Sequence, residues 1–195
     1  MRLILASNNR HKLEEFGRVL RPLGIEVISQ SGAGIQLEVE ETGETFEENA
    51  RLKAEAIFEL THTPVVADDS GLEVDALDNA PGVFSARYGG EGLTDTDRYN
   101  KLLEALTDVP DEKRGARFVC VLHYIDAAGR HYSLRGECPG RIGYAPRGEN
   151  GFGYDPVFMV GEKSFSELSP AEKDAVSHRG RALEQFAELL KEKES

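Results

Sequence analysis

The sequence predicts a mixed α/β fold, organised as one domain over residues 1–195. Apolar runs of strand length alternate with segments whose apolar residues recur at helical spacing, and this pattern predicts alternating strands and helices. Hydrophobic residues make up 39% of the chain, which is enough for a sizeable core. No repeat, low-complexity tract or linker divides the sequence, so we expect one compact unit.

The first half of the chain contains three short apolar runs and two amphipathic segments. They predict strands at residues 2–6, 25–29 and 65–68, a helix at residues 10–20 and a second helix from residue 46. Thr45 and Glu48 form the capping-box pattern that begins the second helix. Pro64 ends that helix, because the residue before a proline disfavours helical conformation.

The second half of the chain begins with a loop rich in Gly, Ala, Pro and Asp and continues with further apolar patterns. They predict a loop at residues 71–92 with a short strand at its start, a helix at 93–106, strands at 116–125 and 131–137, and an irregular glycine-rich segment at 140–156. Ser169, Pro170 and Glu172 combine the N-cap, first-turn proline and capping-box acid of a helix start. Apolar residues between 183 and 190 give a last helix its core-facing stripe.

The composition excludes several classes of partner. The formal net charge of -12 opposes non-specific binding to nucleic acid or to an anionic membrane, because each needs a basic face. A small polyanion held in a local basic pocket stays compatible with this charge. Cys120 and Cys138 suit a reducing compartment, and Cys120 is predicted to fill the core. The apolar run at the N-terminus is too short for a signal peptide and no stretch reaches membrane-span length, so we expect a soluble cytoplasmic protein.

Two adjacent carboxylates, Asp68 and Asp69, end the predicted strand at residues 65–68. Neighbouring acids repel each other and lose hydration when buried, so a cation should compensate them. Mg²⁺ is usually bound by one or two carboxylates together with water and substrate phosphates, and Glu40 and Glu41 supply further acids upstream. Successive side chains of a strand face opposite sides, so only one of the two aspartates is expected in a given site. A solvated acidic loop is the alternative for Glu40 and Glu41.

Three other loops have unusual polar or aromatic character. Residues 7–12 lie between a strand and a helix N-terminus, an arrangement that suits a phosphate, although Ser7 to Asn9 of such a loop taken alone more often serve only as helix caps. Phe152 lies among glycines and could stack on a planar ligand or plug the loop locally. Lys173 and residues 177–179 place cations near the helix that begins at Ser169, where a lone Lys or Arg is commonly solvated.

Taken together, these segments resemble the inosine/xanthosine triphosphate pyrophosphatase family. The resemblance rests on six segments in family order: Ser7-Asn8-Asn9-Arg10-His11-Lys12, Glu40-Glu41-Thr42-Gly43-x-Thr45-Phe46-x-Glu48-Asn49-Ala50-x-x-Lys53-Ala54, Ala67-Asp68-Asp69-Ser70-Gly71-Leu72, Pro81-Gly82-Val83-x-Ser85-Ala86-Arg87-Tyr88, Phe152-Gly153-Tyr154-Asp155 and Ser177-His178-Arg179. It runs from the first predicted strand to the last predicted helix. No single segment is specific, but their combination is.

The resemblance implies an elongated two-lobed mixed-sheet fold with flanking helices, a substrate cleft between the lobes, and a homodimer. The implied activity is Mg²⁺-dependent hydrolysis of XTP, ITP and dITP to the nucleoside monophosphate and pyrophosphate. Glu40 and Asp69 become the magnesium carboxylates, and Asp69 also becomes the catalytic proton acceptor. The implied substrate contacts are Ser7, Asn8, Asn9, Arg10, His11, Lys12, Lys53, Ser70, Phe152, Gly153, Tyr154, Asp155, Lys173, His178 and Arg179.

Chemistry of the base narrows the expected substrates. A 6-keto purine presents acceptors at O6 and N7, whereas adenine presents a donor at N6. Donors from the backbone of His178 or from Arg179 would pair with the keto edge and oppose adenine donor to donor, which leaves buried groups unpaired. We therefore expect rejection of ATP.

Two rival functions remain open on the sequence. A Maf-like nucleotide pyrophosphatase also opens with an apolar strand followed by Ala-Ser, but continues with a Ser-Pro-Arg-Arg type of loop, unlike Asn8 to Lys12 here. A non-catalytic purine-nucleotide-binding module would need base and phosphate contacts but neither Glu40 nor Asp69. The joint presence of these acids favours an enzyme.

Overall fold

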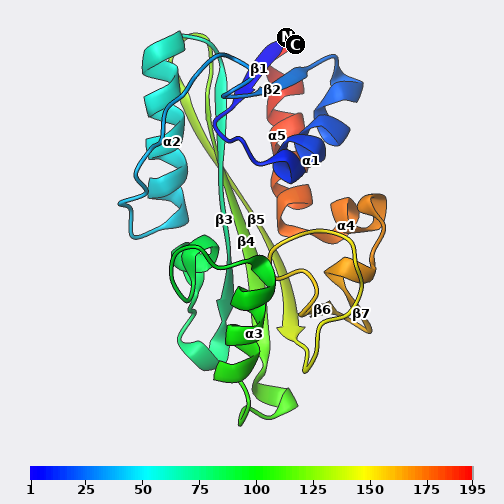
Figure 1. Ribbon diagram of the computed structural model, residues 1–195. Helices are drawn as coiled ribbons and strands as arrows, with labels where there is room; N and C mark the ends of the chain where they lie inside the picture. Colours follow the sequence, from blue (N-terminus) through cyan, green and yellow to red (C-terminus); the bar gives the residue numbers. More distant parts are fainter. Residues whose placement is uncertain (195) are drawn as a thin grey trace. The chain divides into compact units, whose positions relative to one another are not determined.

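The computed structural model describes residues 1–194, which form one seven-stranded sheet with flanking helices (Figure 1). The strands are β1 (Arg2–Leu5), β2 (Glu26–Ser29), β3 (Val65–Val74), β4 (Gly115–Ile125), β5 (His131–Ile142), β6 (Phe158–Val160) and β7 (Lys163–Ser164), in the order β2-β1-β3-β4-β5-β6-β7. The α-helices are α1 (Arg10–Leu20), α2 (Phe46–Thr61), α3 (Asp95–Ala105), α4 (Pro170–Val176) and α5 (His178–Glu194). The sheet is mixed, because β1 pairs in parallel with β2 and β3 whereas β6 pairs antiparallel with β5 and β7. The predicted mixed α/β fold is confirmed.

The chain divides into two compact units. Unit 1 comprises Met1–Asp69, Cys120–Gly136 and the chain from Arg179 onward, and unit 2 comprises Ser70–Val119 and Glu137–His178. The strands β3, β4 and β5 each contribute residues to both units. The elongated shape and the cleft between lobes stay predictions from the resemblance.

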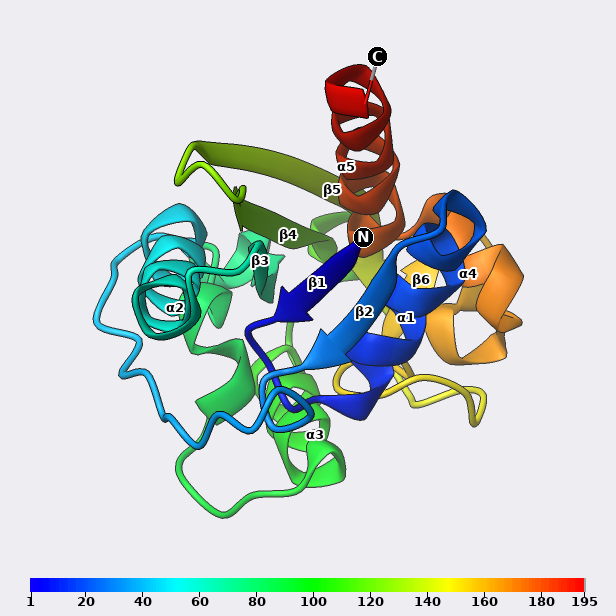
Figure 2. The same ribbon diagram turned by 90° about the horizontal axis from the view of Figure 1, so that it is seen from above.

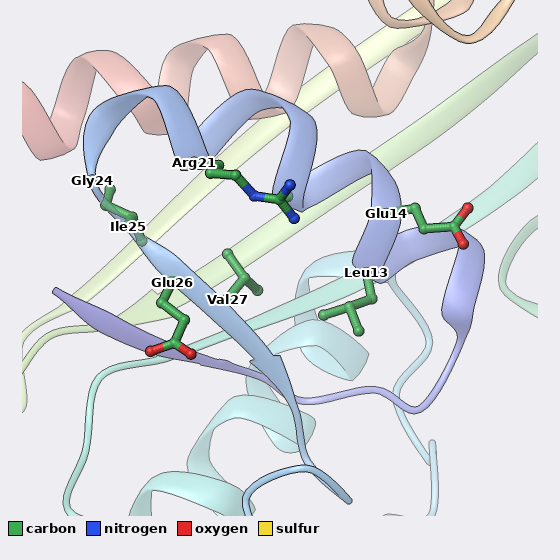
Figure 3. A pocket seen from close by; sticks show the side chains of 8 residues that line it. Leu13, Glu14, Arg21, Gly24, Ile25, Glu26 and Val27 are labelled. Atoms are coloured by element: carbon green, nitrogen blue, oxygen red, sulfur yellow. The ribbon is translucent and has the colours of Figure 1, made fainter.

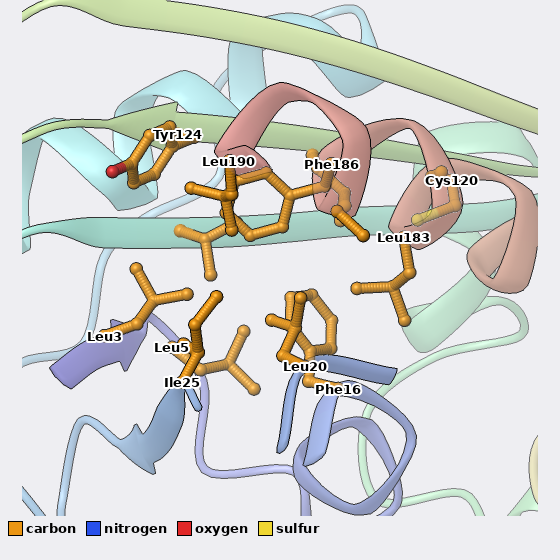
Figure 4. Close-up of a cluster of buried hydrophobic side chains, with 14 residues drawn as sticks. Leu3, Leu5, Phe16, Leu20, Ile25, Cys120, Tyr124, Leu183, Phe186 and Leu190 are labelled. Carbon is orange, nitrogen blue, oxygen red and sulfur yellow. The ribbon is translucent and has the colours of Figure 1, made fainter. Parts of the chain in front are cut away.

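The core of unit 1 has two layers, one on each face of its strands. On one face, Leu3 and Leu5 of β1 and Val66 of β3 pack with apolar residues of α1 and α5 (Figure 4). On the other face, Ile4 and Ala6 pack with Val65 and Ala67 and with apolar residues of α2. Figure 2 shows α2 on one side of β1 and β3, and α1 and α5 on the other. Because successive strand side chains alternate, β1 and β3 each contribute to both layers.

Local signals explain where α1 and α2 begin. Asn9 caps α1 by accepting a hydrogen bond from the amide of Lys12. Thr45 and Glu48 form the predicted capping box of α2, which ends at Thr61. His62 follows in the left-handed conformation, with φ of 48°, and its amide closes the helix on the carbonyl of Phe58.

Unit 2 has a core of its own. Leu72 and Val74 of β3 pack there with Phe118 of β4 and with two apolar residues of α3, Leu102 and Leu103. The helix α3 begins at Asp95 behind a capping box formed by Thr94 and Asp97, slightly later than predicted.

Within residues 1–194, no helix combines the length and apolar character needed to cross a bilayer.

The strands of unit 2 differ most from the sequence-based expectation. The predicted strand at residues 65–68 and the short strand predicted at the start of the 71–92 loop form one continuous strand that ends at Val74, and the predicted strand at residues 131–137 continues to Ile142. Both extensions contain glycine and polar residues, which lower the strand propensity of these segments taken by themselves. Burial of alternate residues such as Leu72, Val74 and Ile142 in the unit 2 core outweighs that weakness. The short strands β6 and β7 were not predicted, because three or two residues carry too little periodicity.

We predict that Phe186→Ala lowers the free energy of unfolding by roughly 3–5 kcal/mol, the usual cost of truncating a buried aromatic ring. Phe186 is fully buried in the α5 layer of unit 1, and its ring centroid lies 5.0 Å from that of Tyr124. Denaturant unfolding monitored by circular dichroism would measure the loss. Leu60→Ala is the control, because Leu60 is 63% exposed and its truncation should change little. Equal losses in both variants would contradict the core assignment.

Candidate functional site

The two adjacent aspartates of β3 face opposite layers of unit 1. Val66 packs in the layer formed with α1 and α5, and Ala67 packs in the layer formed with α2. Because side chains alternate along a strand, Asp68 shares the face of Val66 and Asp69 shares the face of Ala67. Their partners confirm this separation: Asp68 contacts α1 and α5, whereas Asp69 contacts α2.

Asp68 is the centre of a buried ionic network. Its Oδ2 accepts a hydrogen bond from Arg179 Nε at 2.7 Å, and its Oδ1 lies 2.6 Å from Lys12 Nζ. The thiol of Cys120 also donates to Oδ2, at 3.2 Å, so Cys120 does more than fill the core as the sequence predicted. Burial opposes the charge of Asp68, but the attraction of Arg179 and Lys12 outweighs it and holds the pKa of Asp68 well below its usual value. Asp68 is therefore ionised throughout the neutral range.

Arg179 connects Asp68 to α1. Its Nη1 donates to Glu15 Oε2 at 2.6 Å, and the side chains of Arg179 and Glu15 are 2% and 8% exposed. Burial by itself would lower the pKa of Arg179, but Asp68 and Glu15 raise it well above its usual value. The sequence did not single out Glu15. Its position three residues after Lys12, in the same helix, is a signal that could have indicated a shared face.

Asp69 has different surroundings. Its Oδ1 lies 2.9 Å from Lys53 Nζ, and the same ammonium lies 2.6 Å from Glu41 Oε1 and donates to the carbonyl oxygen of Asp68 at 2.9 Å. Burial raises the pKa of Asp69; Lys53 opposes this effect, and the negative charge of Glu41 reinforces it. Asp69 Oδ2 is buried and has no hydrogen-bond partner within residues 1–194. A buried carboxylate oxygen in this state is suited to a metal ion, a water or a ligand.

The loop before α1 uses several of its polar groups to hold its own shape. Ser7 Oγ accepts a hydrogen bond from the amide of Asn9 at 3.1 Å, and Asn9 caps the helix. Asn8 Oδ1 accepts from the amide of Ser31 at 3.0 Å, so it restrains the loop after β2. Arg10 is largely exposed and pairs with Glu14, one turn along the helix. Asn9 thus caps the helix and Lys12 reaches Asp68, while the substrate contacts expected of this loop stay predictions.

In unit 2, the glycine-rich aromatic loop surrounds a buried ion pair. Lys173 Nζ lies 2.8 Å from Asp155 Oδ2, and these side chains are 7% and 4% exposed. The same ammonium lies 4.9 Å from the centroid of the Phe152 ring. Gly151 has φ of 77°, and a Cβ at this position would come 2.1 Å from Asp155 Oδ2, so only glycine fits.

Other predicted contacts of unit 2 are also positioned by packing. The Tyr154 hydroxyl donates to the carbonyl oxygen of Ser85 at 2.6 Å, and burial raises the pKa of Tyr154. His178 is 4% exposed, and its ring stacks on Phe118 with centroids 4.6 Å apart. Ser70 is half-buried at the point where β3 passes into unit 2.

The predicted residues thus form two sets. In the unit 1 set, Lys12 and Arg179 contact Asp68 on one face of β3, and Lys53 contacts Asp69 on the other face. The set in unit 2 joins Phe152, Asp155 and Lys173. Glu40, the predicted metal carboxylate, has an exposed side chain, whereas its neighbour Glu41 contacts Lys53. The roles of all these residues toward substrate and metal stay predictions.

A pocket of about 440 Å³ lies elsewhere in unit 1, beside α1 and the edge strand β2 (Figure 3). Arg21 and Glu14 of the α1 region and Glu26 of β2 line it. Within the described part of the chain, none of its lining residues belongs to the predicted site. The pocket gives no indication of a ligand class.

The fold and the site define an α/β protein with adjacent carboxylates held by lysines on opposite faces of one strand. The chain belongs to the Ham1 family, whose model matches residues 3–189. This membership agrees with the resemblance found in the sequence.

Similar proteins cover nearly the whole chain. The "dITP/XTP pyrophosphatase" of Clostridium perfringens is 46% identical, over 97% of this chain and 97% of its own length. The protein of the same name from Yersinia pestis is 47% identical, over 98% of each chain. Among solved structures, a HAM1 protein from Coxiella burnetii is 45% identical with a TM-score of 0.89, over 98% of this chain and 99% of its own.

We predict that Asp68→Asn lowers the free energy of unfolding by roughly 3–5 kcal/mol, because it leaves the buried Arg179 charge without one of its partners. Asp108→Asn, an exposed acid, should cost almost nothing. The pKa of Asp68 is depressed in the folded protein, so its contribution is complete above the unfolded value of about 3.9 and is lost as pH falls below it. The stability difference from wild type should therefore narrow in acid. A constant difference from neutral pH to pH 3 in urea titrations would contradict this assignment.

Proposed function

We propose that the protein hydrolyses non-standard purine nucleoside triphosphates, namely XTP, ITP and dITP, to the nucleoside monophosphate and pyrophosphate. This reaction removes these nucleotides from the precursor pool. The proposal rests on Ham1 family membership and on relatives named dITP/XTP pyrophosphatase at about 46% identity over nearly the whole chain. The observation that carries the chemistry is Asp69: a buried carboxylate with a raised pKa and one unpartnered oxygen, beside Lys53.

A magnesium ion is part of the proposal. Within residues 1–194, no group of three or more His, Cys, Asp or Glu side chains is arranged to hold a metal by itself. Mg²⁺ commonly takes only one or two carboxylates and completes its shell with water and substrate phosphates, so Asp69 and the Glu40 that the resemblance implies would suffice in number. The unpartnered Asp69 Oδ2 supplies the buried oxygen that such a ligand set requires. When bound, Mg²⁺ would neutralise phosphate charge and polarise the reacting phosphoryl group.

The residues of the chain then have distinct tasks. Lys12 and Lys53 supply ammonium groups to phosphate oxygens, exchanging part of their contact with the carboxylates. Asp69 accepts the proton of the attacking water, and its buried Oδ2 beside Lys53 provides the acceptor. Release of pyrophosphate requires attack at the α-phosphorus. Phe152 stacks on the purine, and backbone donors at His178 and Arg179 select a 6-keto edge over adenine, because the guanidinium of Arg179 already donates to Asp68 and Glu15.

The competing functions have less support. A non-catalytic binding module would not require the buried Asp69, whose ionisation is opposed by burial. A Maf-like enzyme is disfavoured by family membership. We also propose a cytoplasmic homodimer without nucleic-acid or membrane partners, in keeping with the charge of -12.

We predict that purified protein releases pyrophosphate from XTP, ITP and dITP at kcat/KM values at least about a hundredfold above those for ATP, in accord with the penalty for leaving buried groups unpaired. Activity should require Mg²⁺ and disappear with a chelator. The assay is pyrophosphate release across the triphosphate panel, with orthophosphate measured in parallel. Comparable kcat/KM values for ATP, or orthophosphate as the direct product, would contradict the proposal.

We predict that Asp69→Asn lowers kcat/KM by about 10²–10⁴-fold, the usual contribution of a general base, with weaker metal binding as an additional loss. Folding should survive, because the fold opposes ionisation of Asp69 even in the wild type. A thermal melt is the control, and rates are compared at saturating Mg²⁺. Near-wild-type activity in a folded variant would show that another carboxylate is the base.

A further inference from the structure

The loop that carries Phe152 is restrained by two carboxylates from different parts of unit 2. The amide of Phe152 donates to Asp155 Oδ2 at 3.1 Å, and the amide of Gly153 donates to Asp95 Oδ2 at 2.9 Å. Asp155 belongs to the same loop, but Asp95 is the first residue of α3, 58 residues earlier in the chain. Two consecutive amides are thus fixed from two sides.

These restraints act where the backbone is otherwise permissive. Phe152 lies between Gly151 and Gly153, whose φ angles are 77° and 61°. Glycine has access to more backbone conformations than other residues, so a ring carried between two glycines is poorly fixed by the backbone alone. Carboxylate acceptors on successive amides restrict the peptide planes next to the ring, and hence the direction in which the ring points.

The two carboxylates are themselves fixed to different degrees. Asp155 is buried and paired with Lys173. Asp95 is held by the first turn of α3, where Thr94 and Asp97 form a capping box, and its Oδ1 lies 3.6 Å from Arg98 Nη1. The side chain of Asp95 is 56% exposed, so it belongs to no buried core whose collapse would follow its removal.

We propose that Asp95 is a positioning residue for purine recognition, which acts by fixing the Gly153 amide and thereby the ring of Phe152. This inference rests on the proposed function, in which Phe152 stacks on the base. The Asp95 contact involves the aromatic loop of unit 2, whereas the proposed phosphate-binding lysines belong to unit 1. Asp95 therefore acts on affinity for the base and leaves affinity for the pyrophosphate part of the substrate unchanged.

The test compares Asp95→Ala, which removes the acceptor, with Asp95→Asn, which keeps an oxygen at the same place. Asp95→Ala should raise the KM for ITP about three- to tenfold with kcat within about twofold, as expected for one partly exposed hydrogen bond to a charged group. Asp95→Asn should restore most of the affinity. Glu104→Gln, at an exposed position of the same helix, is the matched control and should behave as wild type.

Direct binding separates positioning from general destabilisation. Calorimetry should show weaker binding of inosine 5′-monophosphate to Asp95→Ala by the same factor, with inhibition by inorganic pyrophosphate unchanged and a melting temperature close to wild type. Equal losses for both probes, or wild-type affinity in Asp95→Ala, would overturn the inference. A wild-type protein that binds inosine 5′-monophosphate but releases no pyrophosphate from ITP would refute the proposed activity, while the Asp95 comparison would still be decided by the binding data.

Discussion

The alternation of side chains along β3 is the constraint on which the rest of the site depends. Two adjacent carboxylates in one strand cannot share a face, so Asp68 and Asp69 enter different layers of unit 1 and acquire different partners. Asp68 meets Arg179 and Lys12, whose attraction outweighs the cost of burial. Asp69 shares Lys53 with Glu41, and burial dominates its pKa. One strand thus carries, at consecutive positions, a carboxylate whose pKa is lowered by ion pairs and a carboxylate whose pKa is raised by burial.

This division assigns the lysines as well. Lys12, on α1, and Lys53, on α2, reach β3 from opposite sides, and Lys53 also donates to the backbone carbonyl of Asp68. Each ammonium is thereby directed toward β3. In the proposed function, preorganised charge of this kind lowers the cost of reorganisation when the triphosphate binds. The buried ion pair between Arg179 of α5 and Glu15 of α1 connects these two helices to the Asp68 network.

In unit 2, the feature that needs explanation is how the Phe152 ring is held between two glycines. Lys173 and Asp155 neutralise each other in a buried pair, and the ammonium also lies against the Phe152 ring. Close packing of Gly151 against Asp155 explains why the loop needs glycine, and the carboxylates on successive amides compensate for the freedom that glycine brings. Asp155 therefore both requires glycine at position 151 and restrains the backbone at Phe152.

The sequence by itself determined the α/β class, the helix starts at Asn9 and Thr45 and the opposite orientation of Asp68 and Asp69, because these features depend on local periodicity and capping chemistry. The motif resemblance predicted the family. Tertiary structure alone decided that β3 is one continuous strand and that β5 extends to Ile142, since burial in the core overrides weak local propensity. It also decided that Glu15 meets Arg179, that Cys120 meets Asp68 and that Asp95 meets Gly153, contacts between residues 52 to 164 positions apart. Local patterns carry no information at that separation, because only the packed chain brings such residues together.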